Sequence, residues 1–340
     1  MERYQAKDEG NGPNMVKQIL DNVYCIEVVL PENPLKMLNS YFFKGDAGEQ
    51  NLLVDTGFRR DECWSALRDG LKELDASPEN TDVFLTHLHS DHTGNAGRMQ
   101  KMGFHLMMSD IDNYILQNNN WGQRKERSIK EGFSRKELET VFCHNPAVIY
   151  SSEPFSPIPL QEGQCLHYAG RTFECVLTPG HTKGHMCLLD RENKLMVLGD
   201  HVLFDITPNI TSWTEGYDPL HLYIDSLRRV MDLDVVTPLP GHRTTGSMTL
   251  RERAISLLNH HDARLKEVIN IVDKEPGLTA YQIAARMKWS IRAKNWDDFP
   301  PGQKWFAVGE CLAHLEFLLK EQLIQRKEAD INRYYLAQPD

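Results

Sequence analysis

The segment Thr86-His87-Leu88-His89-Ser90-Asp91-His92 constrains this chain more than any other, because it places three imidazoles and a carboxylate within six residues. Side chains of this kind are costly to bury together unless a cation lies between them. The run that leads into the segment, Val83 to Thr86, has the apolar character of a buried strand. Alternate residues of an extended chain point to the same side, so His87 and His89 share a side and the next two polar groups follow the turn. The segment therefore predicts a metal site at a strand end.

Three later segments have the same character, since each places one histidine or aspartate beside glycine. They are Thr178-Pro179-Gly180-His181, Gly199-Asp200 and Pro240-Gly241-His242. Glycine lets backbones approach closely, so ligands from distant segments can converge on one point. Neutral imidazole and carboxylate are ligands typical of zinc, with iron and manganese as competitors.

Short apolar runs alternate with helical patterns along most of the chain. The runs rich in branched residues predict strands at Val23 to Leu30, Asn39 to Phe43, Leu52 to Val54, Val83 to Thr86, His105 to Met108, Phe173 to Leu177, Met186 to Leu189 and Leu195 to Leu198. Helices are predicted over Arg60 to Leu74 and Gly94 to Met102. Strands and helices mixed on this scale favour an α/β fold with two sheets sandwiched between helices.

The order of these motifs resembles that of the metallo-β-lactamase superfamily. The cluster His87-x-His89-x-Asp91-His92 is followed by three single ligands, and Leu53-Val54-Asp55-Thr56-Gly57 fits the family's first motif. The resemblance covers roughly residues 16 to 270 and implies an αββα sandwich. Within the superfamily, the run Thr178 to His185 is similar to the glyoxalase II-like branch of thioesterases and lactonases. The end of the chain resembles the LACTB2-like members, which implies an appended winged-helix-like domain.

The resemblance implies a binuclear centre that holds two zinc ions, with iron or manganese as alternatives. On this basis the first metal would be held by His87, His89 and His181, and the second by Asp91, His92 and His242. Asp200 would bridge the two, and both aspartates would take part in catalysis. Two cations about 3.5 to 4 Å apart can share a hydroxide and direct it at a carbonyl carbon.

Five more side chains are expected to support the centre. Asp55 and His185 suit a role in orienting the ligands through hydrogen bonds. His201, Tyr217 and Tyr223 are candidates for contact with substrate, because they lie between Asp200 and His242, where loops of such a fold approach the mouth of the site.

The predicted function is metal-dependent hydrolysis of a small-molecule acyl substrate. A thioester of the glyoxalase II or acyl-CoA type is favoured, because a thiolate leaving group needs little protonation. No Gly-x-Ser-x-Gly motif is present to supply a serine nucleophile. Four alternatives stay open: a lactonase, a single-stranded endoribonuclease, an iron-dependent sulfur dioxygenase and a non-enzymatic winged-helix DNA binder.

Two domains are expected, a hydrolase domain over residues 1–272 and a winged-helix-like domain over 273–340, divided near Pro276-Gly277. An insertion at about 110–142 interrupts the first and is interpreted as a lid, so that deleting residues 112–140 should change substrate range more than metal content. Its basic cluster of Arg124, Lys125, Arg127 and Lys130 is interpreted as a solvated helix face rather than a phosphate site.

Composition limits the classes of partner and the compartment that we expect for this protein. The formal charge of −10 argues against nucleic acid as the main partner. The seven cysteines are scattered without a Cys-x-x-Cys pair, which indicates reduced thiols, and no apolar run is long enough to span a membrane. We therefore expect a cytoplasmic enzyme with no membrane contact. The apolar pattern of residues 305–316 would also suit a homodimer surface.

Overall fold

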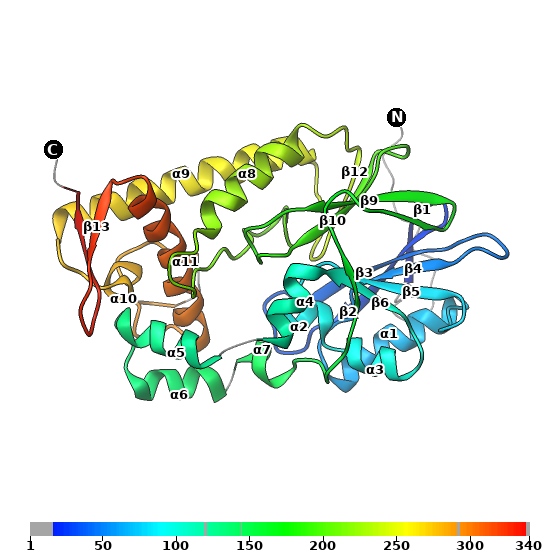
Figure 1. The fold of residues 1–340 in the computed structure, drawn as a ribbon, viewed down its shortest axis with the longest axis horizontal. Coiled ribbons are helices and arrows are strands. Elements are labelled where there is room, and N and C mark those ends of the chain that lie inside the picture. Colours follow the sequence, from blue (N-terminus) through cyan, green and yellow to red (C-terminus); the bar gives the residue numbers. More distant parts are fainter. Residues whose placement is uncertain (1–15, 119–120, 144, 291–292, 338–340) are drawn as a thin grey trace.

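The computed structural model describes residues 16–118, 121–143, 145–290 and 293–337 (Figure 1). Within this part of the chain, one sheet contains seven strands in sequence order: β1 (Val16–Leu20), β2 (Val23–Val29), β3 (Met37–Phe43), β4 (Asn51–Val54), β5 (Thr81–Leu85), β6 (Leu106–Ser109) and β7 (Ile158–Leu160). Pairing is antiparallel from β1 to β4 and parallel from β4 to β7. The carboxyl ends of β4, β5 and β6 therefore meet at one edge.

A second sheet of five strands has the order β12-β11-β10-β9-β8. Its members are β8 (Cys165–Tyr168), β9 (Arg171–Leu177), β10 (Met186–Asp190), β11 (Leu195–Gly199) and β12 (Thr237–Pro240). The strand β12 pairs in parallel with β11 and forms the edge of the sheet. Its two prolines, Pro238 and Pro240, are tolerated there because an edge strand leaves some N–H positions unpaired.

Three apolar cores define the layers. Between the sheets, Phe43 and Phe173 pack edge to face with their ring centroids 4.9 Å apart. The outer face of the first sheet is covered by α1 (Asp61–Glu73) and α3 (Ala96–Lys101), which follows the short α2 (Ser90–Thr93). The outer face of the second is covered by α8 (Pro219–Met231) and the first half of α9 (Leu250–Lys274). The chain is thus an αββα sandwich, as the alternation of apolar runs predicts.

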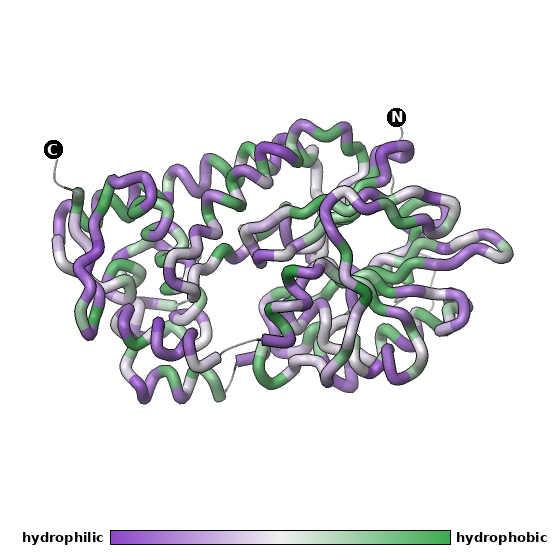
Figure 2. Tube along the Cα trace, in the orientation of Figure 1, coloured by the Kyte–Doolittle hydropathy of each residue, from purple (hydrophilic) through white to green (hydrophobic). Residues whose placement is uncertain are grey.

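The C-terminal region is largely helical. It contains the second half of α9, α10 (Ala280–Ala284), α11 (Pro301–Lys320) and a hairpin of β13 (Ile324–Lys327) with β14 (Arg333–Leu336). Hydrophobic and hydrophilic residues alternate along α9 (Figure 2), and its buried residues Leu257 and Val268 belong to different cores. The helix α9 is therefore shared by the sandwich and the C-terminal region. The winged-helix-like character of residues 273–340 stays a prediction.

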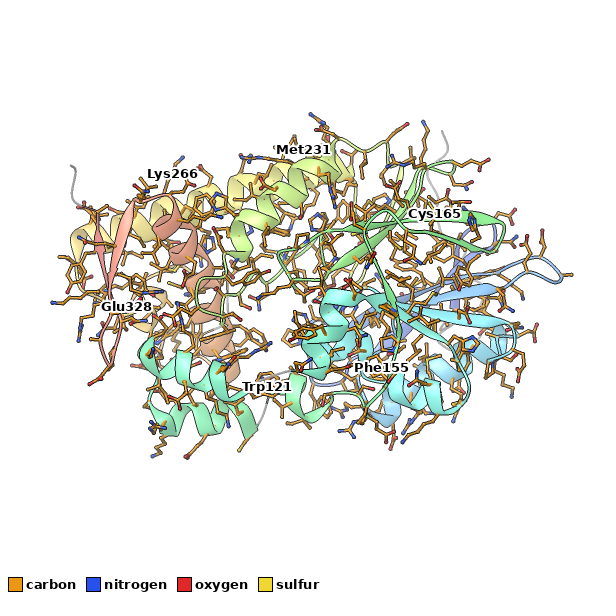
Figure 3. The ribbon with its side chains drawn as sticks, in the orientation of Figure 1. Trp121, Phe155, Cys165, Met231, Lys266 and Glu328 are labelled. Carbon is orange, nitrogen blue, oxygen red and sulfur yellow. The ribbon has the colours of Figure 1, made fainter. Side chains whose placement is uncertain are left out.

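The described residues of the insertion form the helices α4 (Asp110–Gln117), α5 (Trp121–Lys130) and α6 (Arg135–Cys143), and the short α7 (Pro146–Ile149) follows them. Side chains from α6 and the turn before it, Phe133 and Val141 among them, are buried in the same core as Val308 of α11. Figure 3 shows Trp121 at the start of α5, close to the C-terminal helices. The insertion is therefore built into the C-terminal core and is not only a cover.

The interpretation of the basic cluster as a solvated face is wrong for one of its members. Arg127 is buried and forms ion pairs with Glu131 at 3.0 Å and with Glu316 at 2.6 Å. Arg124 is partly buried against the ring of Trp121. These contacts tie α5 to α11. Among the described residues, no helix is both long and apolar enough to cross a membrane.

Candidate metal centre

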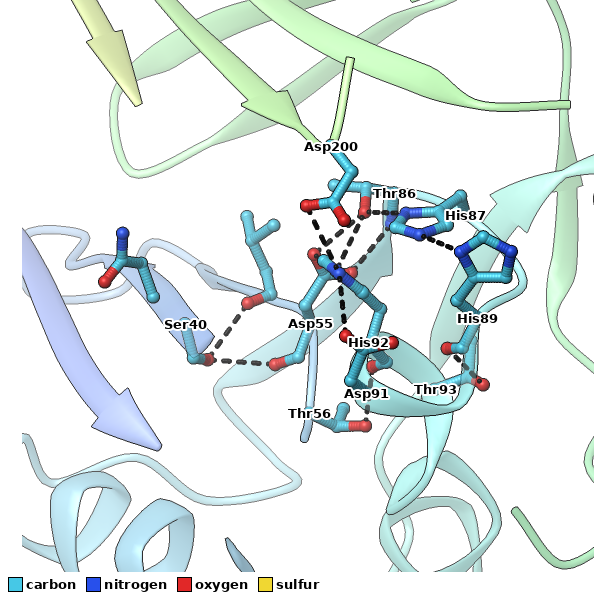
Figure 4. Close-up of polar contacts among 12 residues, drawn as sticks. Ser40, Asp55, Thr56, Thr86, His87, His89, Asp91, His92, Thr93 and Asp200 are labelled. Carbon is cyan, nitrogen blue, oxygen red and sulfur yellow. Dashed lines mark hydrogen bonds and ion pairs between the residues drawn. The ribbon is translucent and has the colours of Figure 1, made fainter. Parts of the chain in front are cut away.

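The first group of polar side chains lies at the carboxyl end of β5. His87 and His89 leave the strand, and α2 then carries Asp91 and His92 (Figure 4). The turn is held by Asp55, which follows β4. One carboxylate oxygen of Asp55 accepts a hydrogen bond from the Thr86 N–H at 2.8 Å, and the other accepts from the Nδ1–H of His92 at 2.7 Å.

The second group comes from the second sheet. His181 lies in the loop between β9 and β10, Asp200 directly after β11 and His242 directly after β12. The Nδ1–H of His181 donates to the carbonyl of Asn209 at 2.9 Å, and that of His242 to the carbonyl of Met37 at 2.7 Å. With these Nδ1 atoms used as donors, the Nε2 atoms of both rings are left as free acceptors.

Three overlapping sets of three side chains converge, and the atoms within each set lie within 4.8 Å of one another; His87, His92 and Asp200 form the set that joins the other two. Of those two, one is His87, His89 and His181, and the other is Asp91, His92 and His242. Asp200 reaches both sets. Its Oδ2 is 3.6 Å from the Nε2 of His181, and its Oδ1 is 3.5 Å from the Nε2 atoms of both His92 and His242.

Several of these atoms are buried without a hydrogen-bond partner among the described residues. They include the Nε2 atoms of His92, His181 and His242 and the Oδ1 of Asp200. Such polar atoms are costly to bury, and cations placed among them would satisfy all four. Five imidazoles and two carboxylates with no thiolate form a donor set that fits divalent transition metals.

The electrostatics of the cluster differ from ligand to ligand. Burial opposes protonation of His92 and His242, but neighbouring carboxylates nevertheless raise the pKa of both rings, and a bound cation would displace those protons. Burial and the neighbouring imidazoles hold the pKa of His87 well below its usual value, so this ring is neutral. Burial opposes ionisation of Asp91, but His92 and His242 nevertheless lower the pKa of Asp91 to about 2. The carboxylate is therefore charged at neutral pH.

Two glycines permit the close approach of the second sheet. A Cβ on Gly199, whose φ is +48°, would lie 2.7 Å from the Nε2 of His185. A Cβ on Gly241 would lie 2.8 Å from the Oδ1 of Asp200. Side chains at either position would displace the groups that face the metal site.

His185 lies behind the cluster. Its Nδ1 is 2.8 Å from the Thr178 hydroxyl, and its Nε2 accepts a hydrogen bond from the Asp200 N–H at 3.1 Å. The residue is fully buried. This geometry places His185 in support of Asp200.

The three candidates for substrate contact lie in different surroundings. His201 and Tyr223 have no exposed surface and pack against one another with ring centroids 5.5 Å apart. Neither lines the cavity at the cluster, and contact of these two residues with substrate stays a prediction. They are buried because α8 closes over the end of β11. Tyr217 does line the cavity.

That cavity has a volume of about 1890 Å³ and opens beside the cluster. At one end it is lined by His89, Asp91 and Asp200, and at the other by Trp289 and Phe306 of the C-terminal region. Pockets for small ligands usually measure about 300 to 1,000 Å³. The space is large enough for an extended substrate.

Sequence reasoning missed Asp112, at the start of α4. Its carboxylate is fully buried and accepts hydrogen bonds from the Leu88 N–H at 2.9 Å, the Thr182 hydroxyl at 2.6 Å and the Gly184 N–H at 2.7 Å. The residue thereby joins the loop of His89 to that of His181. The only local signal is Ser109, three residues earlier, which caps α4 and indicates a helix start but no contact with the cluster.

Comparisons with known proteins agree with the geometry of this site. A family model described as the metallo-beta-lactamase superfamily matches residues 34–242, more than half of the chain. A lactamase-like protein, adaB, of Aspergillus niger is 26% identical over 287 residues, which cover 80% of this chain and 71% of that protein. An atrochrysone carboxyl ACP thioesterase of Emericella nidulans is 27% identical over 63% of this chain and 54% of its own length.

Other similar proteins cover more of their own length. The beta-lactamase-like protein 2 homolog of Caenorhabditis elegans is 24% identical over 78% of both chains. A metallo-beta-lactamase family protein of Thermus thermophilus has a crystal structure that aligns with a TM-score of 0.78 and 26% identity, over 94% of this chain and all of that one. A beta-lactamase domain protein of Burkholderia ambifaria aligns over 96% of both chains with a TM-score of 0.79 and 23% identity.

Proposed function

The chain belongs to the metallo-β-lactamase superfamily and is a hydrolase of that superfamily, and from this premise we propose that it cleaves acyl thioesters at a dinuclear metal centre. The observation that carries the proposal is the placement of Asp200, whose Oδ2 faces His181 and whose Oδ1 faces His92 and His242. In this proposal His87, His89 and His181 hold one ion. Asp91, His92 and His242 hold the second, and Asp200 is shared.

Zinc is the proposed metal, with iron or manganese as alternatives, because imidazole and carboxylate donors suit all three. Bound at this position, a pair of divalent ions would supply Lewis acidity and a water activated at neutral pH. The residues of the chain orient the ligands: Asp55 through His92 and His185 through the Asp200 N–H. These hydrogen bonds fix the rings and the carboxylate before substrate enters.

A thioester is proposed because Asp91, the cavity-lining carboxylate expected to act as the acid, is a poor proton donor for the leaving group. Asp91 lines the cavity, yet the pKa of Asp91 is lowered to about 2, so it is a poor acid at neutral pH. A thiolate leaves without prior protonation, whereas an alkoxide or amine needs an acid. The printed name of the Emericella nidulans relative, an ACP thioesterase, supports the same class. The substrate is therefore proposed to be a small acyl group on a thiol carrier.

The proposal is tested by metal analysis of the purified protein followed by a panel of substrates. We expect about two equivalents of zinc and hydrolysis of thioesters faster than that of lactones with the same acyl group. His89→Ala should remove both metal and activity, while Tyr223→Phe, outside the cavity, should keep both. Full metal occupancy and full hydrolysis in the His89 variant would contradict the proposed centre.

The same panel separates the other classes. Faster cleavage of lactones would assign a lactonase, cleavage of single-stranded RNA with steep salt dependence an endoribonuclease, and oxygen uptake with a persulfide a sulfur dioxygenase. A DNA-binding role is disfavoured because Val308, Leu312 and Leu315 of α11 are fully buried in the protein. DNA retention by metal-free protein would support that role instead.

We keep two domains in the proposal, with their division near residue 272. Part of the insertion is added to the second domain, since Val141 of the insertion packs in the same core as Val308 of α11. The C-terminal domain, winged-helix-like in this proposal, then includes α5 and α6. Together they form the far wall of the cavity and give the site its depth.

A further inference from the structure

Two hydrogen-bond donors beside the candidate metal centre have no role in holding it. Lys183 follows the candidate ligand His181 by two residues, and Tyr217 lies just before α8. Both line the cavity, and the Nζ of Lys183 lies over the ring of Tyr217, 4.2 Å from its centroid. An ammonium group and a phenol are thus placed together on the wall that borders His181.

Hydrogen bonds hold the chain at or next to each residue. Lys183 lies between Thr182 and Gly184, and both of these donate hydrogen bonds to the buried carboxylate of Asp112. The carbonyl of Tyr217 accepts a hydrogen bond from the buried Ser212 hydroxyl at 2.8 Å. Anchored neighbours lower the entropy that the two side chains lose when a ligand binds.

Neither donor has a hydrogen-bond acceptor or an ion-pair partner within the described part of the chain. The Tyr217 hydroxyl is buried and has no hydrogen-bond partner, and Lys183 forms no ion pair there. The carboxylates that affect Tyr217 are already engaged: Asp112 accepts three hydrogen bonds, and Asp218 caps α8 and binds the Nδ1 of His221 at 2.6 Å. Burial and these two carboxylates raise the pKa of Tyr217, so the hydroxyl keeps its proton and can donate.

From these contacts we propose that Lys183 and Tyr217 form a subsite for an anionic oxygen group of the substrate. A carboxylate or phosphate could accept from both the ammonium and the phenol, which are otherwise unsatisfied. The inference rests on the proposed thioester hydrolysis and adds a preference for a charged substrate. The anion is either a carboxylate on the acyl group or the phosphate of a phosphopantetheine carrier arm, and the experiment separates these sources.

Direct binding tests the subsite without hydrolysis. The purified protein is titrated by calorimetry with glutarate, and separately with 4′-phosphopantetheine and its uncharged counterpart pantetheine. We expect at least one anion to bind, and Lys183→Met to weaken it by about tenfold or more because a charged hydrogen bond is lost. Tyr217→Phe should weaken it by about three- to tenfold. Lys101→Met removes an exposed lysine outside the cavity, paired with Glu153, and serves as the control.

Kinetics then assign the anion to its source. Glutaryl and pentanoyl thioesters of N-acetylcysteamine differ only in the acyl carboxylate, so a selective loss of kcat/KM for the glutaryl substrate in Lys183→Met places the anion on the acyl group. A selective loss for acyl-phosphopantetheine over acyl-pantetheine places it on the carrier.

The two proposals fail in different ways. Equal losses for charged and neutral partners, or binding of neither anion to the wild-type protein, would overturn the subsite even if thioesters are cleaved. If no thioester is cleaved but the anion binds through Lys183, the subsite stands and the thioesterase proposal fails.

Discussion

Replacing Asp112 by alanine should weaken the metal centre although the residue contacts no candidate ligand. Its carboxylate accepts hydrogen bonds from Leu88, between His87 and His89, and from Thr182 and Gly184, which flank Lys183. All three donors would lose their partner. The two ligand loops would then be free to separate.

The expected loss of stability follows from the donors that lose their acceptor. The Thr182 hydroxyl can rotate to another acceptor, but the buried Gly184 N–H and the partly buried Leu88 N–H cannot. A buried donor costs about 1 to 3 kcal/mol when unsatisfied, and a partly buried one costs less. Burial raises the pKa of Asp112 to about 6, so removal of this carboxylate also relieves some desolvation. We expect the free energy of unfolding to fall by about 2 to 4 kcal/mol. Metal affinity should fall by about 10- to 100-fold, as for other residues that support ligands.

Urea unfolding and competition with a chromogenic chelator measure the two effects. The matched control is Asp110→Ala, in the same first turn of α4, where the side chain is only partly buried and its one hydrogen bond within the described chain, from Gln161, is 3.4 Å long. Metal affinity and unfolding free energy within error of this control would refute the reasoning. The prediction also replaces the expectation for a deletion of residues 112–140, which would remove Asp112 and should lower metal content as well as change substrate range.

Three further predictions concern other sites. Asp200→Ala should lower the metal content, measured by elemental analysis, and reduce kcat/KM by about a thousandfold. Unchanged values would contradict the proposal that Asp200 is shared by the two ions. Arg127→Met leaves the buried Glu131 without its cation and should cost about 3 to 5 kcal/mol in urea unfolding, whereas Lys130→Met, exposed on the same helix, should cost under about 0.5. Burial raises the pKa of Glu310 from 4.5 to about 7. The contribution of this group to the free energy of unfolding is therefore present below pH 4.5 and is lost as the pH rises towards 7. Between pH 4.5 and 7.5, the unfolding free energy of Glu310→Gln should rise by about 3 kcal/mol relative to wild type, and parallel profiles of the two proteins would exclude this.

Much of the sandwich could be predicted from local pattern. The strand runs at residues 83–86 and 195–198 and the helix over residues 60–74 have strong periodic or apolar signals, and each forms as expected. The edge strand β12 was not predicted, because two of its four residues are proline and its pairing comes only from β11. The insertion helices were not resolved into elements either, since α6 buries its apolar residues against a core that lies far along the chain.

The candidate metal ligands were found in the sequence because their chemistry is local: imidazoles and carboxylates cluster at strand ends beside glycine, whatever surrounds them. Sequence order and motif spacing thus determined the superfamily and the set of seven side chains. Only the tertiary structure decided which groups support or face the site. Asp112 became a link between two loops, His201 and Tyr223 were buried behind α8, and Lys183 was placed over Tyr217. Burial and hydrogen-bond partners depend on segments distant in the chain, and no local pattern encodes them.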